Sequence, residues 1–337
     1  MRSRNFALTL ALCASAAAAA APVAAQPPII HIGAGHPYSL AEAINNRGQV
    51  VGVMNFPEDE GRFHAYVWEG GGLRDLNPGG FGQAYDINDR GQIVGVADLG
   101  DGVGDSVLWD DGAPPVRLET PAGARCLALR INAHGLVVGW CLFASESGPV
   151  IWRHGVFERM AVPLGVDAFP SGLNDRGVVV GNASRTDGSR FPFVWTDGVL
   201  IDLNTISDRP FERVVAINKH GQIAGEGPGP DGRSQGLLWQ AGRTLVIPPL
   251  PGATAAIPYG LNDRGQVTGD SAACGFVWDD AGSRALSCLP GGHVAYGTAI
   301  NERGDIAGHA VAPPDNFLPN AVIWPGAGKH PPGRVDR

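Results

Sequence analysis

Four of the five cysteines form two local pairs, and this spacing predicts disulfides. Cys126 and Cys141 flank one hairpin-like segment, and Cys274 and Cys288 flank another. In an exported protein such pairs favour disulfides over buried thiols. A three-residue loop centred on Ala281 would place the second pair opposite each other, whereas a bulged turn would direct the first pair to opposite faces of the sheet. We nevertheless expect both disulfides, Cys126–Cys141 and Cys274–Cys288.

Three aspartates in one loop are the candidate metal ligands of this chain. Asp98, Asp101 and Asp105 lie close together, and calcium prefers several oxygen ligands. The calcium-loop pattern D-x-[DN]-x-[DN]-G is absent, however, and no other repeat carries an equivalent loop. The sequence therefore favours a solvated acidic loop over a metal site.

Familiar catalytic motifs are missing from the sequence. It contains no G-x-S-x-G, H-E-x-x-H or C-x-x-C motif and no phosphate-binding glycine loop, and its nine histidines lack metal-ligand spacing. We therefore predict no catalytic residues and no cofactor. The sequence leaves open whether two carboxylates meet at the separation that glycoside chemistry requires.

Aromatic residues recur shortly before one repeated asparagine motif. All lie an odd number of residues before that asparagine, so we expect them to share a strand face with the apolar residue that precedes it and to pack in the core. A ring of aromatic side chains for binding carbohydrate is the alternative. The residues are Tyr38, Phe81, Tyr85, Phe169, Phe211, Tyr259 and Tyr296.

The motif itself occurs seven times, at spacings of 39 to 44 residues. Its copies are INNRGQVVG (44–52), INDRGQIVG (87–95), INAHGLVVG (131–139), LNDRGVVVG (173–181), INKHGQIAG (217–225), LNDRGQVTG (261–269) and INERGDIAG (300–308). An apolar segment ending in tryptophan follows each copy, and Trp140 is the one tryptophan outside this pattern. Each unit reads as four short strands separated by turn residues. The repeat therefore predicts an all-β fold, a seven-bladed β-propeller of four-stranded blades.

The spacing N-x-x-G predicts a hairpin turn. The asparagine side chain can accept a hydrogen bond from a nearby main-chain N–H, and the glycine can take a left-handed conformation. The asparagines are Asn45, Asn88, Asn132, Asn174, Asn218, Asn262 and Asn301. The glycines are Gly48, Gly91, Gly135, Gly177, Gly221, Gly265 and Gly304. We expect structural roles for them, and a close main-chain approach at the second glycine of each motif.

The two ends of the chain predict how the ring closes. The last copy offers no fourth strand after Trp324, whereas residues 29–32 supply an extra one. We therefore expect the N-terminal strand to complete the last blade. The predicted organisation is a signal peptide over 1–25, a propeller over 26–324 and a flexible tail over 325–337.

The N-terminal segment has the features of an export signal. Arg2 and Arg4 precede an alanine-rich apolar stretch, and small residues lie before Gln26. We predict a secreted or periplasmic protein, with no membrane insertion. The formal net charge is −8 without a basic stripe, which argues against nucleic acid as a partner.

The pattern A-x-x-I-N-x-x-G-x-x-x-G, with the tryptophan strand and a G-x-x-x-D-L segment, resembles the HAF family of predicted extracellular repeats. The resemblance covers nearly all of residues 26–324. The family's His-Ala-Phe triplet is matched best by His64-Ala65-Tyr66, and the other six copies depart from it. The family has no assigned reaction, so the resemblance implies an exported repeat protein and no catalytic residues.

The loops predict where a partner would bind. One set, between the second and third strands and between blades, varies widely in length, whereas the turns at the other end are short and uniform. Variable loops on a rigid scaffold are typical of binding surfaces. We therefore predict a monomeric binding scaffold for an unknown protein or glycan. The alternatives are an envelope glycan hydrolase or lyase acting at the channel mouth, and a purely structural envelope protein.

Overall fold

The structure is a computed structural model, and it describes residues 28–329 except 60, 101, 111, 273 and 312–317. These residues belong to one compact unit, which spans Pro27–Lys329. The predicted signal peptide (1–25) and the last eight residues of the predicted tail lie outside the described residues. None of the described residues forms a helix long and apolar enough to cross a membrane.

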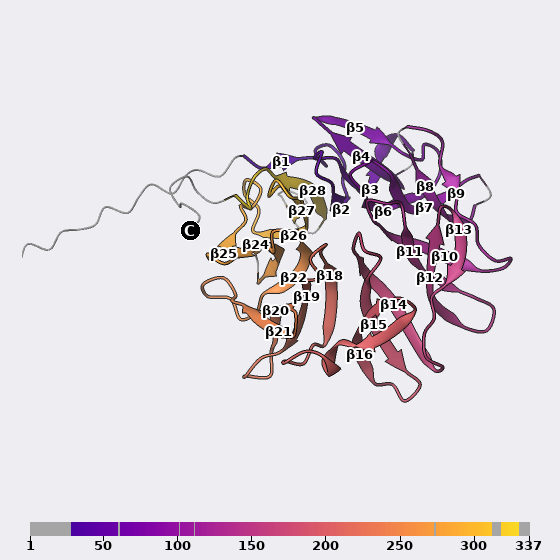
Figure 1. Cartoon of the computed structure of the whole chain (residues 1–337). Coiled ribbons are helices and arrows are strands. Elements are labelled where there is room, and N and C mark those ends of the chain that lie inside the picture. The colour runs from indigo at the N-terminus through magenta and orange to yellow at the C-terminus, as the bar shows by residue number, and fades with distance from the viewer. Residues whose placement is uncertain are drawn as a thin grey trace, which may run out of the picture. The chain divides into compact units, whose positions relative to one another are not determined.

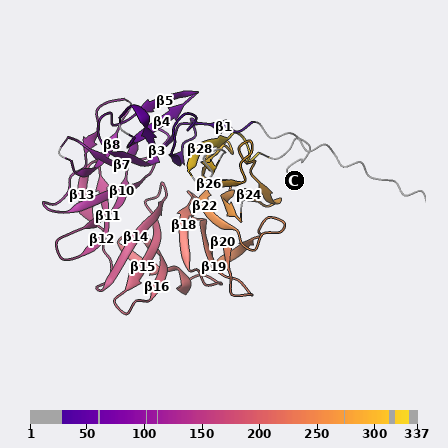
Figure 2. The same ribbon diagram turned by 180° about the vertical axis from the view of Figure 1, so that it is seen from behind.

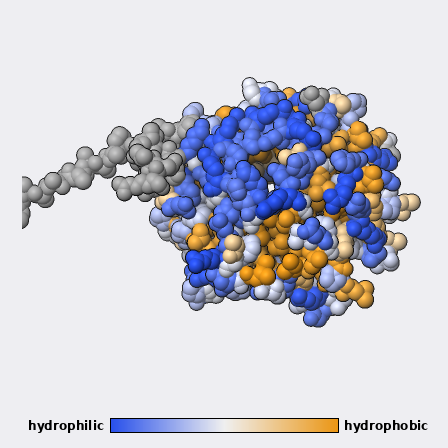
Figure 3. Space-filling view, in the orientation of Figure 1, coloured by the Kyte–Doolittle hydropathy of each residue, from blue (hydrophilic) through white to orange (hydrophobic). Residues whose placement is uncertain are grey.

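The described residues form a seven-bladed β-propeller, as predicted. Seven four-stranded antiparallel sheets are arranged as blades around a central axis (Figures 1 and 2). Within blades 1 to 6 the strands pair in chain order, from the innermost strand outwards. The face in Figure 3 has hydrophilic residues over the middle of the ring and hydrophobic residues mainly toward its lower and right edges.

The first four blades have the following strands. Blade 1 contains β2 (Ser39–Ile44), β3 (Val50–Phe56), β4 (Arg62–Glu69) and β5 (Gly72–Asp75), with a short 3-10 helix η1 (Pro57–Asp59) between β3 and β4. Blade 2 contains β6 (Gly82–Ile87), β7 (Ile93–Asp98), β8 (Gly104–Trp109) and β9 (Val116–Arg117). Blade 3 contains β10 (Arg125–Ile131), β11 (Val137–Leu142), β12 (Ser147–Arg153) and β13 (Val156–Arg159). Blade 4 contains β14 (Val166–Leu173), β15 (Val179–Arg185), β16 (Arg190–Thr196) and β17 (Val199–Asp202).

The remaining three blades complete the ring. Blade 5 contains β18 (Arg213–Ile217), β19 (Ile223–Pro228), β20 (Ser234–Gln240) and β21 (Arg243–Ile247), preceded by the 3-10 helix η2 (Leu203–Thr205). Blade 6 contains β22 (Ile257–Leu261), β23 (Val267–Ser271), β24 (Cys274–Asp279) and β25 (Gly282–Ala285). Blade 7 contains β26 (Val294–Ile300), β27 (Ile306–Val311), β28 (Pro319–Trp324) and the N-terminal β1 (Ile30–His31).

The hydrophobic core lies between neighbouring blades. Val94 of blade 2, for example, packs with Val137 and Trp152 of blade 3. In every blade the repeated tryptophan is the last or second-last residue of the third strand. Four of these tryptophans donate their indole N–H to a main-chain oxygen in the segment after the preceding blade's fourth strand. The Trp152 bond, to the oxygen of Glu119, is 2.6 Å long. The repeated tryptophan is therefore a packing residue between blades.

The ring closes as the sequence predicts. Ile30 and His31 of β1 pair with Ile323 and Val322 of β28, so the N-terminal strand completes the blade that the C-terminal strands begin. Residues 325–329, in contrast, do not form the expected loose tail. Ala327 is buried, and the main-chain N–H of Gly328 donates to the oxygen of Gly304 at 2.8 Å. This turn packs against the last motif. The close approach is possible because Gly304 of the motif and Gly328 of the turn both lack a side chain.

The loops gather at two ends of the ring. In four blades the glutamine that follows the motif's glycine donates to the residue just after the repeated tryptophan; Gln49 to Glu69 is one example, at 3.1 Å. These bonds place the N-x-x-G turns and the loops after the tryptophans together, at what we call the motif end. The opposite end, which carries the loops of variable length, we call the variable end.

Every innermost strand contains a β-bulge, which the sequence did not reveal. The extra residue lies three positions before the motif's asparagine, as at Glu42, between Ala41 and Ala43. A bulge reverses the alternation of side chains beyond it. The prediction that the odd-spaced aromatics pack in the core is therefore wrong for Phe169, which lies in β14 ahead of the bulge and is 44% exposed. It is also wrong for Phe81, which precedes β6 and is 45% exposed, whereas Phe211, at the same distance from its asparagine, is buried.

The same bulge explains the one disulfide found among the described residues, Cys126–Cys141. The bulged N-x-x-G turn shifts the register by one residue, and the second bulge shifts it back, so that Cys126 lies directly opposite Cys141. The second predicted disulfide is wrong in this structure, where Cys274 and Cys288 are free thiols. Their hairpin has a two-residue loop, with Asp279 opposite Gly282, and a continuation of this register would bring Ser287, not Cys288, opposite Cys274. Burial raises the pKa of the Cys288 thiol, and so does Cys274, which lies beside it.

Candidate functional site

The turns at the motif end have the geometry that their residues predict. In the first turn the Oδ1 atom of Asn45 accepts hydrogen bonds from the main-chain N–H groups of Arg47 and Gln49, both at 3.0 Å. Gly48 has a φ of +85°, which an L side chain rarely adopts. The asparagine Oδ1 accepts from the same two positions in all seven turns.

The same asparagines also link the blades, which the sequence did not reveal. Each Nδ2 atom donates to the main-chain oxygen of the equivalent asparagine in the next blade, at 3.0 to 3.2 Å. The last bond runs from Asn301 to Asn45, so the seven side chains form a closed ring of hydrogen bonds. All seven are buried, and each one serves both its own turn and the next blade.

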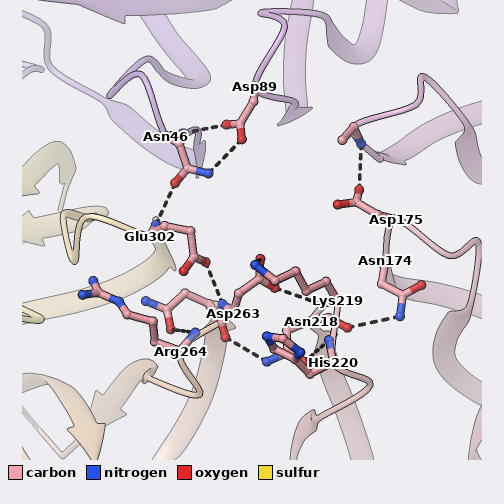
Figure 4. Close-up of polar contacts among 12 residues, drawn as sticks. Asn46, Asp89, Asn174, Asp175, Asn218, Lys219, His220, Asp263, Arg264 and Glu302 are labelled. Carbon is pink, nitrogen blue, oxygen red and sulfur yellow. Dashed lines mark hydrogen bonds and ion pairs between the residues drawn. The ribbon is translucent and has the colours of Figure 1, made fainter.

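The residue after each asparagine forms a second ring, at the channel mouth. When this residue has a side-chain oxygen, that oxygen accepts a hydrogen bond from the main-chain N–H of the equivalent residue in the preceding blade. Asp89 accepts from Asn46 at 2.8 Å, for example, and Glu302 accepts from Asp263 at 2.6 Å. Figure 4 shows these side chains pointing toward the neighbouring blades. Lys219 also forms an ion pair with Asp263 at 3.0 Å.

These two rings line a cavity of about 200 Å³ at the motif end. The asparagine side chains of these rings, and most of the acidic ones, already form hydrogen bonds between blades. Burial raises the pKa of Glu302, as does the neighbouring Asp263 carboxylate, whereas Lys219 and Arg264 lower it. The polar side chains of the motif end therefore hold the blades together.

Charged residues of the innermost strands of blades 1 to 3 are also committed to the fold. The carboxylate of Asp86 accepts from the main-chain N–H groups of Ile87 and Ile131, both at 2.9 Å, and so joins blade 2 to blade 3. Burial raises the pKa values of Asp86 and Glu42, and the Arg130 guanidinium lowers both. Asp86 therefore serves as a contact between blades 2 and 3.

The variable end carries a cavity of about 350 Å³ between blades 3, 4 and 5. Trp140 of β11 and Phe169 of β14 line it with their aromatic rings, whose centroids are 6.0 Å apart. Phe191 of β16 also lines it, and the guanidinium of Arg185 covers the ring of Phe191 at 3.9 Å. The cavity lies beside the loop of residues 184–190, one of the loops whose variability predicted a binding surface.

Polar groups surround these aromatic rings. Asp167 is held in place because it accepts from the indole N–H of Trp140 at 3.2 Å and from the hydroxyl of Ser147 at 3.0 Å. Asn182, Arg190, Glu212 and Arg213 also line the cavity. The site thus combines apolar ring faces with carboxylates, an amide and guanidinium groups, the composition typical of small-molecule sites.

Two of the three candidate metal ligands have other partners. The Oδ1 atom of Asp98 accepts from the main-chain N–H groups of Gly100 and Gly102, at 2.8 and 2.9 Å. Asp105 forms an ion pair with Arg117 at 2.6 Å, and Asp101 lies outside the described residues. No group of three or more potential ligands that could hold a metal occurs among the described residues.

Sequence reasoning did not identify Trp140 as a site residue, although the signal was present. It is the one tryptophan outside the repeat, and it occupies the position directly after the motif's second glycine, where blades 1 and 2 have valine. Phe169 was recognised as an aromatic candidate, but the unforeseen bulge reversed its expected direction.

Comparisons with known proteins show the fold alone. No family model and no curated protein matches the chain, so the resemblance to the HAF family stays a prediction. A puromycin-hydrolyzing peptidase from Mycobacterium tuberculosis is similar in structure, with a TM-score of 0.59 and 15% identity over 93% of this chain and 57% of that one. The chain thus spans little more than half of that peptidase. The β-propeller domain of the Trilobed protease from Pyrococcus furiosus has a TM-score of 0.58 and 11% identity, over 86% of this chain and 94% of that domain.

Proposed function

We propose that the protein is an exported binding propeller that holds an oligosaccharide in the cavity formed by Trp140 and Phe169. The observation that carries this proposal is the pair of aromatic rings, 6.0 Å apart, in a cavity of about 350 Å³ with carboxylate, amide and guanidinium groups around it. Phe169 is 44% exposed, so its ring is available to a ligand.

The chemistry of the cavity matches that of a sugar. A pyranose ring has an apolar face of C–H groups, which packs on an aromatic ring, and an edge of hydroxyl groups, which need hydrogen-bond partners. Asp167 supplies acceptors and Arg190 supplies donors. The amide of Asn182 is already bonded to the main-chain N–H and oxygen of Val214, both at 2.9 Å, and so has one N–H left to offer a ligand. Because Asp167 is fixed by Trp140 and Ser147, little side-chain entropy is lost when it binds a hydroxyl group.

Two further observations support an exported scaffold. The disulfide Cys126–Cys141 suits the oxidising environment outside the cytoplasm, as expected for a secreted or periplasmic protein. The binding cavity lies at the variable end, whereas the polar groups of the motif end are used to hold the blades together.

Isothermal titration calorimetry tests the proposal with cello-, xylo-, chito- and manno-hexaose and with hexagalacturonate. We expect one or more of these sugars to bind, and Trp140→Ala to weaken that binding at least tenfold. Phe81→Ala is the control, because Phe81 is an exposed aromatic residue next to the start of an innermost strand but does not line the cavity. The absence of binding by every sugar, or equal losses in Trp140→Ala and Phe81→Ala, would overturn the proposal.

A further inference from the structure

The sugar cavity contains two carboxylates that are held in place by neutral groups. Asp167 accepts from the indole N–H of Trp140 at 3.2 Å and from the hydroxyl of Ser147 at 3.0 Å. Glu212 also lines the cavity, and its Oε2 atom accepts from the hydroxyl of Ser234 at 3.3 Å. Because all three donors are uncharged, they orient the two carboxylates without offsetting their negative charge.

The guanidinium groups of the cavity do not balance these charges. The Nε atom of Arg213 donates to the Oε1 atom of Glu226 at 2.6 Å, so its positive charge is already offset by a residue of the neighbouring strand. Arg190, at the start of β16, forms no ion pair within the part of the chain that the structure describes. The lining thus has two uncompensated carboxylates and one uncompensated guanidinium. This excess of negative charge favours a cationic group on the ligand over an anionic one.

The position of Asp167 suits a substituent of a stacked sugar ring. Asp167 and Phe169 are two residues apart in β14, ahead of its bulge, so both side chains leave the strand on the same face. Both residues are exposed, and the Oδ1 atom of Asp167 lies at the edge of the Trp140 indole that carries Nε1. A pyranose ring that packs on an aromatic face directs its equatorial groups past the edge of that face. A carboxylate at this edge can therefore reach them.

The two acidic residues are departures from the repeat, as Trp140 is. Asp167 lies seven residues before the asparagine of its motif and Glu212 lies six residues before its own, and no other blade has an acidic residue at either position. Trp140 stands where blades 1 and 2 have valine. Three side chains that the repeat does not require thus line the same cavity, so the needs of the fold do not explain them.

We propose that the oligosaccharide in this cavity contains an amino sugar, whose protonated amine binds to Asp167 and is attracted by Glu212. The inference rests on the proposed sugar binding and names the class of sugar. In a glucosamine unit the amine is an equatorial group of the pyranose ring, so it can reach the edge of the aromatic ring on which the sugar packs.

The contacts of Asp167 leave room for this amine. Each of its carboxylate oxygens accepts one hydrogen bond in the structure and has a second lone pair for an ammonium N–H. A hydrogen bond between two charged groups is stronger than one between neutral groups. The faces of Trp140 and Phe169 also attract a cation.

The test compares two sugars that share a chain and differ in charge. Glucosamine hexasaccharide carries protonated amines in mildly acidic buffer, whereas N-acetylglucosamine hexasaccharide carries neutral amides at the same positions. In calorimetric titrations of the full chain, we expect the glucosamine sugar to bind more tightly by about fivefold or more, the effect of one ion pair at an exposed site. The preference should shrink as salt is added, because salt screens exposed charges.

Asp167→Asn separates the charge of this side chain from its position. The asparagine amide can still accept from Trp140 and donate to Ser147, so the cavity should keep its shape while the negative charge is lost. We expect this variant to lose the preference for the glucosamine sugar and to bind the N-acetylated sugar as the unsubstituted protein does. Glu158→Gln is the control, because it removes the same charge from an exposed residue of β13 that does not line the cavity, and it should keep the preference.

The outcomes distinguish this inference from the proposed function. If the N-acetylated sugar or hexagalacturonate binds as tightly as the glucosamine sugar, and Trp140→Ala weakens that binding, sugar binding stands and the amino-sugar inference is overturned. Equal losses for both sugars in Asp167→Asn would also overturn it, since Asp167 would then only position Trp140. Binding of the glucosamine sugar that Trp140→Ala leaves unchanged would be adsorption of a polycation to an acidic protein, which overturns it as well. If no sugar binds, the proposed function and this inference both fail.

Discussion

The Nδ2 atom of Asn301 donates a hydrogen bond to the main-chain oxygen of Asn45, 3.0 Å away and 256 residues earlier in the chain. This bond joins the last blade to the first with the same contact that joins every other pair of blades. The seam at which the chain closes is therefore chemically equivalent to the six seams within it. The N-terminal strand β1 adds a second link at that seam, through its pairing with β28.

A serine supports this seam, and we expect its loss to destabilise the protein. The hydroxyl oxygen of Ser39 accepts the main-chain N–H of Ala321 at 2.8 Å, and Ser39 is fully buried. Ser39→Ala leaves that N–H without its acceptor, which should lower the free energy of unfolding by about 1 to 3 kcal/mol. Urea denaturation monitored by tryptophan fluorescence measures the change.

Ser106→Ala is the control for this experiment. Ser106 is also buried, but its hydroxyl has no hydrogen-bond partner among the described residues. Removing this hydroxyl should leave the stability unchanged or raise it, because no partner is lost. Equal losses of stability in the two variants would show that the bond between Ser39 and Ala321 does not stabilise the seam.

The second glycine of the motif should tolerate no side chain. A Cβ atom at Gly95 would overlap the main-chain oxygen of Gln83, and the equivalent glycines of the other six motifs have the same close approach. Because main-chain atoms within a sheet cannot move aside cheaply, we expect Gly95→Ala to destabilise the protein by about 3 kcal/mol. Gly104→Ala, where no atom lies within 4 Å of the added Cβ, should change the stability by less than about 0.5 kcal/mol. A neutral Gly95→Ala would contradict this packing.

The sequence predicts the number of blades, the strands and the closure, because these depend on residues that recur at fixed positions. The asparagine turn and the second glycine are examples, since each has one geometry that its side chain permits. The bulge three residues before each asparagine could not be predicted in this way. Glu42, Leu129 and Ser171 all occupy it, so no residue type marks it. The direction of Phe169 depends on that bulge and was therefore predicted wrongly.

The candidate site was partly readable from the sequence. The variable loops indicate the correct end for the cavity, but Trp140 stands out only when the copies are aligned on their second glycine.

The cysteines show why pairing across a sheet is harder to predict from the sequence. Register errors of a single residue decide whether two side chains meet across a sheet, and the lengths of the turns leave that register open. Cys126 and Cys141 lie directly opposite each other because two shifts cancel. The hairpin of Cys274 and Cys288 has a different register, and these two cysteines remain free thiols although they are neighbours.

The disulfide should make the stability of the protein sensitive to reductant. Cys126 and Cys141 close a loop of 15 residues, for which the loss of chain entropy in the unfolded state corresponds to about 3 kcal/mol. We expect a reductant such as dithiothreitol to lower the urea midpoint of the unsubstituted protein, and the double variant with both cysteines changed to alanine to show the lower midpoint without reductant.

Cys274→Ser combined with Cys288→Ser is the control for the disulfide. These two cysteines are free thiols, so the double serine variant should respond to dithiothreitol as strongly as the unsubstituted protein does. If the serine variant instead loses its response, the stabilising disulfide is the second pair and the pairing described by the structure is wrong.

Asp270 and His309 should make the stability depend on pH in opposite directions. Burial raises the pKa of Asp270 from 3.8 to about 6, so between these values the unfolded state releases a proton that the folded state keeps, and stability falls as the pH rises. Burial lowers the pKa of His309 from 6.5 to about 4, so between these values the unfolded state binds a proton that the folded state does not, and stability rises with pH.

Single substitutions separate these two effects. Between pH 4 and pH 6, Asp270→Asn should make the urea midpoint rise more steeply with pH than it does in the unsubstituted protein, whereas His309→Gln should make it fall. The contribution of Asp270 is about 1 kcal/mol, after a reduction for the solvent that screens this partly exposed carboxylate. Parallel profiles for the three proteins would show that neither group is buried as described.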